Sequence, residues 1–387
     1  MHGRIVAYLP GYTTHRQPAY NIRGAPGNEL THLVYAFAGF KQQGADWVAD
    51  YPEPDDPTTN LPALADLKRK WPHLRIHISI GGYANSQKTD PSGRSIFSVI
   101  AATDHARQAF VSSCLDLFFG DAIVQVGPHP TLFDGVDIDW EYPSATDKPN
   151  FTLLLQEFRR QLDAAGRNHG RTFELTIASD VVPRDIDLGV VAATIDWFNV
   201  MAYVAHQPNH SSHNKYTDFN SPLHAAPSPP EPPTNRTWDI DDGLRNNYLS
   251  AGVPADRLVL GVNAYARVYG GVQNVDHGLY QAYAGPAGDN GVLPYRELVS
   301  TYIPSYESHW DAVTGSSYLY SPATSIWMSY DGTQSVKEKA GYANQLGLGG
   351  MMLWELSADT TSIAVNPPKP PASSLLATMK ANLHARN

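Results

Sequence analysis

The sequence has little cysteine and no long apolar run, and both shortages exclude classes of protein. Cys114 is the single cysteine among 387 residues, so no disulfide can form within the chain and the fold must depend on its hydrophobic core. Cys114 lies in an amphipathic, helix-like run, which is typical of a buried, inert thiol. No apolar stretch reaches the roughly 18 residues that cross a bilayer, so we expect no membrane partner.

Charge is also scarce. Charged residues make up 17% of the chain and the net charge is −10, without long runs of one sign. A nucleic-acid partner would need a basic surface, so we expect none, and a neutral substrate fits better than a polyanion. An aromatic content of 11% excludes intrinsic disorder. We expect a monomer.

The first residues, Met1–Arg4, run directly into a strand-like segment and show no signal peptide. We expect a secreted protein whose signal peptide is absent from this sequence, with a cytoplasmic protein as the alternative.

Short β-rich runs alternate with stretches that are long enough for helices. The predicted strands are Arg4–Leu9, Thr31–Ala38, Arg75–Ile80, Phe133–Trp140, Phe173–Ala178, Trp197–Ala202, Arg257–Ala264 and Gly349–Trp354. The predicted helices are Leu61–Lys70, His105–Phe119, Asn150–Ala165, Ile240–Ala251 and Ser335–Leu346. Eight such strands predict an α/β fold, a (β/α)₈ TIM barrel.

Two long segments depart from the simple repeat. A loop rich in Pro, His, Asn and Ser, residues 204–236, follows the sixth strand, on the face where barrel enzymes build their sites. Residues 268–320 separate strands seven and eight by more than a helix needs, and we expect a small α+β insertion there. The prediction is one catalytic barrel domain over residues 1–387 that contains this insertion.

The fourth predicted strand carries alternating acids. Asp137, Asp139 and Glu141 share one face, and the apolar residues between them share the other. Three converging carboxylates cannot all ionise, so at least one is pushed toward its protonated form. A metal cluster or a solvated acidic edge is the alternative, but one straight strand suits Mg²⁺ or Ca²⁺ poorly. The pattern favours a catalytic site that needs a proton donor.

Four motifs in order resemble glycoside hydrolase family 18, the chitinases and their relatives, over about Gly3 to Asp359. The motifs are Asp134-Gly135-x-Asp137-x-Asp139-x-Glu141, Ser79-Ile80-Gly81-Gly82, Met201-Ala202-Tyr203 and Gly349-Gly350-Met351-Met352-Leu353-Trp354-Glu355. Leu258-Val259-Leu260-Gly261 with Tyr265 and Arg267 resembles the family's seventh strand.

The resemblance implies a substrate-assisted, retaining mechanism. Glu141 would protonate the glycosidic oxygen, while the 2-acetamido oxygen of the sugar attacks the anomeric carbon and forms an oxazolinium. Asp139 would accept a hydrogen bond from the acetamido N–H, and Asp137 would share a proton or charge with it. Tyr203 would donate to the acetamido carbonyl, and Trp354 would form an apolar floor. Asp134 has the opposite parity, so we expect a structural role.

The remaining candidates for substrate binding are Tyr265, Arg267, Tyr8, Phe37, Tyr142, Met201 and Tyr83. We expect no cofactor and no metal. His206, His210 and His213 would suit a metal only in a helix, and the Pro and Asn content of their loop argues against one.

Two positions depart from the family pattern. Val204 stands where the family usually has Asp, which contacts the same acetamido group, and Tyr83 stands where Trp is common. Val204 removes a polar partner and a buried charge near Glu141, so we expect an altered pH optimum.

The expected function is hydrolysis of β-1,4-linked N-acetylglucosamine in chitin or chito-oligosaccharides, with that sugar as partner. One alternative is a chitinase-like lectin with little or no activity, which the intact Glu141 disfavours. Another is an endo-β-N-acetylglucosaminidase acting on N-glycan or peptidoglycan.

Overall fold

The computed structural model describes residues 3–120, 131–209, 214–226, 238–360 and 372–384. Eight parallel strands hydrogen-bond in the order β1-β15-β8-β7-β6-β5-β4-β2, and pairing of β1 with β2 closes the barrel. The strands are β1 (Arg4–Pro10), β2 (His32–Gln43), β4 (Arg75–Gly81), β5 (Gly135–Asp139), β6 (Glu174–Asp180), β7 (Trp197–Met201), β8 (Leu258–Asn263) and β15 (Gly350–Trp354). The predicted TIM barrel is confirmed, and β3 (Asp46–Asp50) extends β2 as an antiparallel hairpin.

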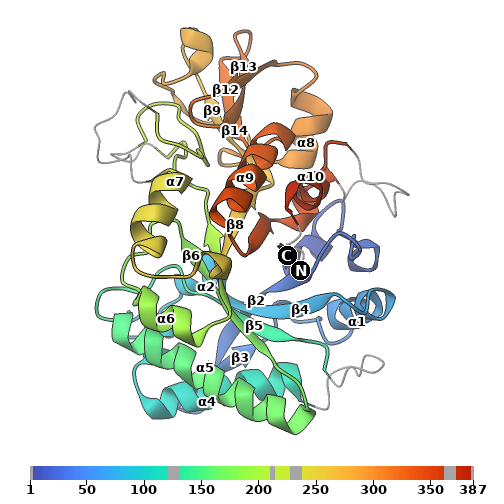
Figure 1. The fold of residues 1–387 in the computed structure, drawn as a ribbon, viewed down its shortest axis with the longest axis vertical. Coiled ribbons are helices and arrows are strands. Elements are labelled where there is room, and N and C mark those ends of the chain that lie inside the picture. The colour runs from blue at the N-terminus through green and yellow to red at the C-terminus, as the bar shows by residue number, and fades with distance from the viewer. Residues whose placement is uncertain (1–2, 121–130, 210–213, 227–237, 361–371, 385–387) are drawn as a thin grey trace.

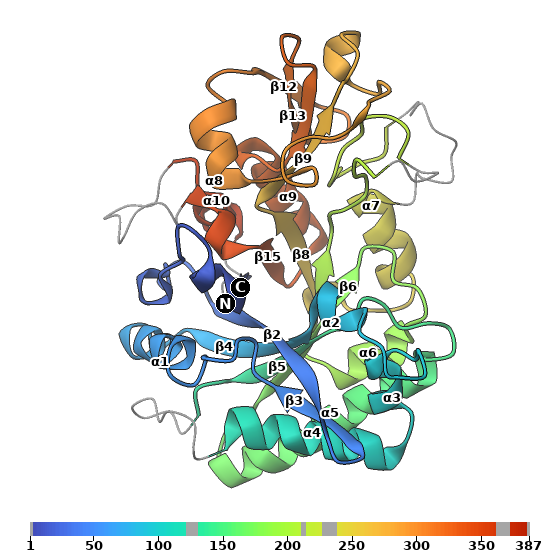
Figure 2. The ribbon, with the colours of Figure 1, turned by 180° about the vertical axis from the view of Figure 1, so that it is seen from behind.

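Helices cover the outside of the barrel (Figures 1 and 2). They are α1 (Asn60–Lys70), α3 (Ile96–Ala101), α4 (Asp104–Phe119), α5 (Lys148–His169), α6 (Leu188–Thr194), α7 (Ile240–Gly243), α9 (Thr333–Leu346) and α10 (Leu375–Asn382), while the short α2 (Gly82–Ser86) follows β4 at the carboxyl end of the barrel. All five predicted helices are present, although the one that begins at Ile240 continues beyond α7 as a π-helix, Leu244–Leu249.

An antiparallel sheet is inserted between β8 and β15 and forms the upper part of the molecule in Figure 1. Its strands are β9 (Tyr265–Gly270), β10 (Gly285–Pro286), β11 (Val292–Pro294), β12 (Glu307–Asp311), β13 (Ser316–Ser321) and β14 (Ile326–Tyr330), with α8 (Tyr295–Glu297) beside them. The inserted strands therefore span 265–330, a wider range than the expected 268–320. The boundary differs because β9 begins only one residue after β8 ends, so the largely apolar sequences of the two strands follow one another almost directly.

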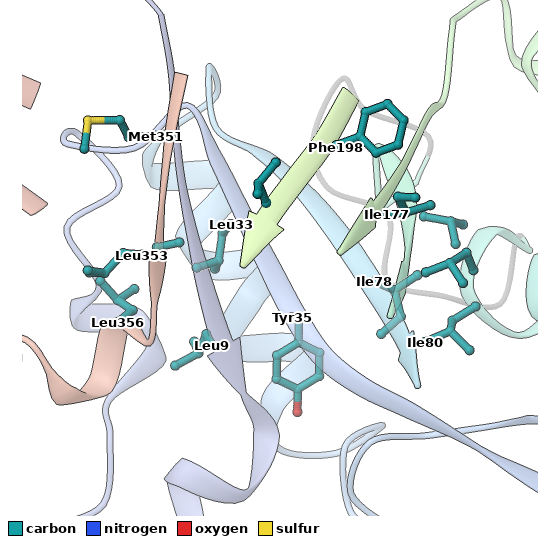
Figure 3. Close-up of a cluster of buried hydrophobic side chains, with 14 of the residues drawn as sticks. Leu9, Leu33, Tyr35, Ile78, Ile80, Ile177, Phe198, Met351, Leu353 and Leu356 are labelled. Atoms are coloured by element: carbon teal, nitrogen blue, oxygen red, sulfur yellow. The ribbon is translucent and has the colours of Figure 1, made fainter. Parts of the chain in front are cut away.

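Alternation along the barrel strands produces two separate cores. Side chains that point outward pack beneath the helices, and Figure 3 labels Leu9, Leu33, Tyr35, Ile78, Ile80, Ile177, Phe198, Met351, Leu353 and Leu356 among them. Side chains that point inward form a smaller cluster in the lumen, which consists of Val6, Tyr8, Val34, Ala36, Trp197, Tyr203, Val259 and Met352. The lumen is thus a packed interior on which a site can be built at the carboxyl ends of the strands.

Cys114 is buried in α4 without a disulfide, and burial raises the pKa of its thiol well above the ordinary value. Of the helices in the described segments, none combines enough length with enough apolar character to cross a membrane.

Candidate active site

The acids of β5 follow the alternation that the sequence predicts. Asp137 and Asp139 are buried and face the lumen, whereas Val136 and Ile138 belong to the outer core. Glu141 follows the end of the strand and is partly buried. The three carboxyl groups therefore rise in sequence order from the interior of the barrel toward its carboxyl end.

Asp137 is the deepest of the three, and four donors surround its carboxylate. Its Oδ2 accepts hydrogen bonds from the Tyr8 hydroxyl at 2.8 Å and from Ser79 Oγ at 2.7 Å. Its Oδ1 accepts from Thr176 Oγ1 at 2.6 Å and from Asn199 Nδ2 at 3.1 Å. These donors come from four different strands and occupy the acceptor positions of the carboxyl group, so Asp137 is held firmly in place inside the barrel.

Asp139 lies one step above Asp137 in a very different environment. Its Oδ1 has no hydrogen-bond partner among the described residues. Burial, followed by the charges of Glu141 and Asp137, raises the pKa of Asp139 well above its ordinary value. These surroundings favour the protonated form of Asp139, which agrees with the expectation that three neighbouring acids cannot all ionise.

The backbone of Glu141 is held by Ser86, the last residue of α2, and by Gln87, which follows α2. The Glu141 N–H donates to Ser86 Oγ at 2.8 Å, and Gln87 Nε2 donates to the Glu141 carbonyl at 3.1 Å. Because both the N–H and the carbonyl of Glu141 are hydrogen-bonded, the backbone that carries its carboxyl group is fixed although it lies beyond the end of β5.

The Glu141 carboxyl group has a pKa raised to about 7, and burial is the largest cause. Hydrogen bonding from Tyr142 lowers the pKa, the negative charge of Asp180 raises it, and the Tyr83 backbone lowers it. A carboxylic acid that is half-protonated near neutral pH can both give and accept a proton, as general acid-base chemistry requires.

Two glycines at the end of β4 allow this close approach. Gly81 has φ +113°, and a Cβ there would lie 2.1 Å from the Asp139 carbonyl oxygen. Gly82 has φ +75°, and a Cβ there would lie 2.6 Å from the Phe37 ring. The Ser79-Ile80-Gly81-Gly82 motif therefore brings β4 against β5 and starts α2 beneath Phe37.

Aromatic rings form a platform at the same end of the barrel. The Trp354 ring stacks on Phe37 with 5.6 Å between ring centroids and an interplanar angle of 26°, and it lies 5.7 Å from the Tyr8 ring. The peptide bonds Ala36-Phe37, Glu141-Tyr142 and Trp354-Glu355 are cis. The Tyr8 hydroxyl is occupied, because it donates to Asp137 and accepts from Asn199.

Tyr203 reaches the lumen from the end of β7. Its hydroxyl has Met352 Sδ at 4.0 Å as a weak partner, and its ring lies 6.3 Å from that of Tyr265. The Arg267 guanidinium carbon lies 5.2 Å from the Tyr265 ring, and Arg267 Nε has no hydrogen-bond partner among the described residues. Tyr265 and Arg267 belong to β9, so the insertion contributes one wall of the site.

The remaining candidates lie nearer to solvent. Tyr83 on α2 is 68% exposed and Tyr142 is 50% exposed, which is unusual for large rings. Met201 ends β7 and packs partly against the lumen cluster. The structure thus gathers all twelve predicted site residues at the carboxyl ends of the strands, with Asp137 and Tyr8 at the bottom and the two exposed tyrosines at the rim.

Sequence reasoning missed three polar residues of this site: Thr176, Asn199 and Asp180. Thr176 and Asp180 share one face of β6, and Asn199 is the only polar residue of β7 apart from the indole N–H of Trp197, so this parity was the signal that could have identified them.

Val204, the departure from the family pattern, has a left-handed backbone with φ 69°. Its N–H donates to Asn220 Oδ1 at 3.1 Å, and its side chain packs against the lumen cluster. The β-branched Val is a poor fit for this conformation, which Asp and Asn adopt more readily.

Asp134 has the structural role that its parity predicts. It is buried, accepts from Lys68 Nζ at 2.6 Å and from the Ile76 N–H at 2.8 Å, and also pairs with Arg171. Burial opposes ionisation of Asp134, but the neighbouring cations outweigh burial and lower its pKa.

Groups that could hold a metal lie away from these acids. His32, His77 and Glu174 cluster at the opposite end of the barrel, where Glu174 also pairs with Arg75 at 2.7 Å. His277, Glu307 and His309 cluster on the insertion. In the loop after β7, His206 pairs with Asp218 at 3.4 Å, whereas His210 and His213 lie outside the described residues.

A closed parallel barrel with stacked acids and an aromatic platform at the carboxyl ends of its strands defines a TIM barrel of the glycoside hydrolase class. The chain belongs to glycosyl hydrolases family 18, whose family model matches residues 4–359.

Curated relatives and solved structures agree with this assignment. The chain is 30% identical to Chitinase A1 of Niallia circulans over 94% of its own length, and it spans 57% of that relative. It is 30% identical to Chitotriosidase-1 of Mus musculus over 92% of its own length and 73% of the relative. Chitinase ChiA74 from Bacillus thuringiensis superposes with a TM-score of 0.83 at 28% identity, covering 99% of this chain and 70% of that one. A class V chitinase mutant from Nicotiana tobaccum in complex with NAG4 gives 0.80 at 27% identity and covers 99% of each chain.

Proposed function

We propose that this protein is a chitinase that hydrolyses β-1,4-linked N-acetylglucosamine in chitin or chito-oligosaccharides with retention of configuration. The observation that carries the proposal is Glu141, a carboxyl group at the mouth of the barrel with a pKa of about 7. An acid with this pKa keeps its proton near neutral pH and can give it to a leaving sugar oxygen.

In the first step of the proposed reaction, Glu141 transfers its proton to the glycosidic oxygen as the bond to the anomeric carbon breaks. The 2-acetamido oxygen of the same sugar attacks that carbon and forms a cyclic oxazolinium. Asp139 accepts a hydrogen bond from the acetamido N–H, and Tyr203 donates its hydroxyl to the acetamido oxygen. Among the described residues the Tyr203 hydroxyl has only the Met352 sulfur as a partner, so it is available for this contact.

In the second step, Glu141 is a carboxylate and accepts a proton from water. The water oxygen attacks the anomeric carbon and reopens the oxazolinium, and the proton returns to Glu141. The carboxyl oxygens of Asp137, held in place below Asp139, favour the cationic intermediate electrostatically. The Trp354 ring, supported by Phe37, offers its face to the C–H groups of the reacting sugar.

A sugar-binding protein without hydrolysis is the second candidate, and Val204 is the observation that favours it. Val204 offers no polar group to the acetamido substituent where the family usually has Asp. Both candidates require a groove that binds oligosaccharide, so only turnover separates them.

The test is incubation of the protein with pentamers and hexamers of N-acetylglucosamine, with the products followed over time. We expect shorter oligosaccharides from the native chain and none from Glu141→Gln, while the variant still binds the hexamer in a calorimetric titration. Binding without turnover in the native chain would establish the second candidate. Equal turnover in both proteins would refute the role of Glu141.

A further inference from the structure

Asp180 is a partly buried acid at the end of β6, and the mechanism above does not use it. Along β6, Thr176 bonds to Asp137 in the lumen, whereas Ser179 accepts a hydrogen bond at 2.7 Å from Tyr248, which lies outside the barrel. Because side chains alternate, Asp180 faces the same way as Thr176. Its side chain therefore stands at the mouth of the lumen.

The strand registers bring Asp180 next to the reacting groups. The register of β5 with β6 ends with the pair Ile138 and Ile177, so the carboxyl ends of the two strands lie side by side, where Glu141 follows β5 by two residues and Asp180 ends β6. On its other side, β6 pairs Asp180 with Met201, two residues before Tyr203. Asp180 thus ends the strand that lies between β5, which Glu141 follows, and β7, which Tyr203 follows.

The loop after β6 holds the Asp180 carboxylate in place. The Val182 N–H donates to Asp180 Oδ1 at 3.1 Å. Burial raises the pKa of Asp180 to about 6, although hydrogen bonds from the Val182 and Val181 backbones and the charge of Arg184 oppose this rise. Above pH 6 Asp180 is an anion, and its charge favours the protonated forms of Glu141 and Tyr142.

We propose that Asp180 replaces, from β6, the carboxylate that Val204 cannot supply from the end of β7, and that it acts as a positioning residue which keeps the proton on Glu141. This inference rests on the proposed function and adds a residue to it. Val204 cannot take this role because its side chain is apolar and packs against the lumen cluster.

Other ionisable groups face Glu141 from the neighbouring elements. They are Asp137 and Asp139 on β5, Tyr8 on β1, Tyr83 on α2, Tyr142 after β5, Tyr203 after β7, and Tyr265 and Arg267 on β9. Asp139 and the buried tyrosines Tyr8 and Tyr203 have raised pKa values, which favour their neutral forms in the range where Glu141 titrates. Asp180 therefore changes charge close to that range.

The consequence is a defined shift in the titration of Glu141. Asp180→Asn removes the charge but keeps an oxygen that accepts from the Val182 N–H, so the loop is preserved. Without the neighbouring anion the pKa of Glu141 falls, and the alkaline limb of the pH–rate profile moves to lower pH by about one unit.

The experiment compares the native chain, Asp180→Asn, Val204→Asp and the double variant. We expect Val204→Asp to return the alkaline limb toward its native position in the Asp180→Asn background. The exposed Asp187 makes no side-chain cap to α6, so Asp187→Asn is the matched control and should leave the profile unchanged.

A second readout separates this inference from the proposed function. The Glu141 carboxyl carbon is titrated by ¹³C NMR, with its signal assigned by its absence in Glu141→Gln, and this readout needs no turnover. A native chain that fails to hydrolyse the hexamer would refute the proposed function, whereas a lower titration midpoint in Asp180→Asn would still support the coupling. Identical midpoints in the native chain and Asp180→Asn would overturn the inference, whatever the activity.

Discussion

At the scale of single residues, the three acids of one strand differ because their surroundings differ. Asp137 accepts four hydrogen bonds, whereas Asp139 lies one step above it with an oxygen that has no partner among the described residues. Glu141 lies at the mouth, where burial is incomplete. Differences in hydrogen bonding and burial thus give chemically similar groups different environments, and Glu141 is the one whose pKa, at about 7, makes its proton exchangeable near neutral pH.

The pKa of Glu141 sets the pH dependence of activity. The acid must be protonated in the free enzyme, and its pKa is raised to about 7, so the reactive form is present below that value and is lost above it. We expect kcat/KM for the hexamer to fall about tenfold per pH unit above this point. Steady-state rates between pH 5 and pH 9 check this, and a profile that stays flat to pH 9 would contradict it.

Tyr203→Phe tests the contact with the acetamido group. We expect kcat to fall about 100-fold, as for the loss of one preorganised donor, with little change in the free energy of unfolding. Tyr8→Phe is the comparison, because its hydroxyl bonds Asp137 and Asn199, and its loss should lower the free energy of unfolding by about 1–3 kcal/mol. Kinetics and urea unfolding of both variants measure the two effects. A native kcat in Tyr203→Phe would remove that residue from the mechanism.

Sequence parity was enough to predict that the β5 acids face inward, since this depends on one strand alone. It was not enough to predict the partners of Asp137, because Thr176 and Asn199 reach it through the registers of other strands. Asp180 was missed because its position near Glu141 depends on how β6 lies beside β5, which the sequence of β6 alone does not give.

At the scale of elements, the sequence predicted all eight barrel strands because each is a short apolar run between polar loops. It missed α6, which has seven residues and too few turns for a clear helical pattern. The limits of the insertion also differed, since β9 follows β8 after a single residue, Ala264, and no turn signal separates them.

The junction of β4 with α2 depends on Gly81. Gly81→Ala would place a Cβ against the Asp139 carbonyl oxygen with a strained positive φ, so we expect a loss of more than about 2 kcal/mol in the free energy of unfolding. Gly341 lies inside α9 with open space around it, and Gly341→Ala should instead stabilise by about 0.5–1 kcal/mol. Urea unfolding measures both, and equal stabilities for the two variants would contradict this account of the motif.

At the scale of the whole molecule, a buried ion pair ties the insertion to the barrel. Asp331 follows β14, and both of its oxygens accept from Lys339 Nζ on α9 at 2.7 Å. Lys339 also donates to Ser221 Oγ at 2.6 Å, and the Asn263 N–H at the end of β8 donates to Asp331 at 3.3 Å. The pair therefore fixes the place where the chain returns from the wall of the site to the barrel.

Removing one partner of this pair would leave a buried charge uncompensated. We expect Lys339→Met to lower the free energy of unfolding by about 3–5 kcal/mol, because Asp331 is 2% exposed. The exposed pair of Lys41 with Asp50 is the control, and Lys41→Met should change stability by less than about 1 kcal/mol. If the free energy of unfolding fell by a similar amount in the two variants, the buried pair would contribute no more to stability than the exposed pair.

The account rests on proton donation by Glu141 to a sugar whose own acetamido group attacks, and the configuration of the first product tests this most directly. The native protein is mixed with the N-acetylglucosamine hexamer, and the anomeric protons are followed by ¹H NMR before mutarotation is complete. We predict that the new reducing ends appear first as the β-anomer and then equilibrate. New reducing ends that appear first as the α-anomer would contradict the mechanism.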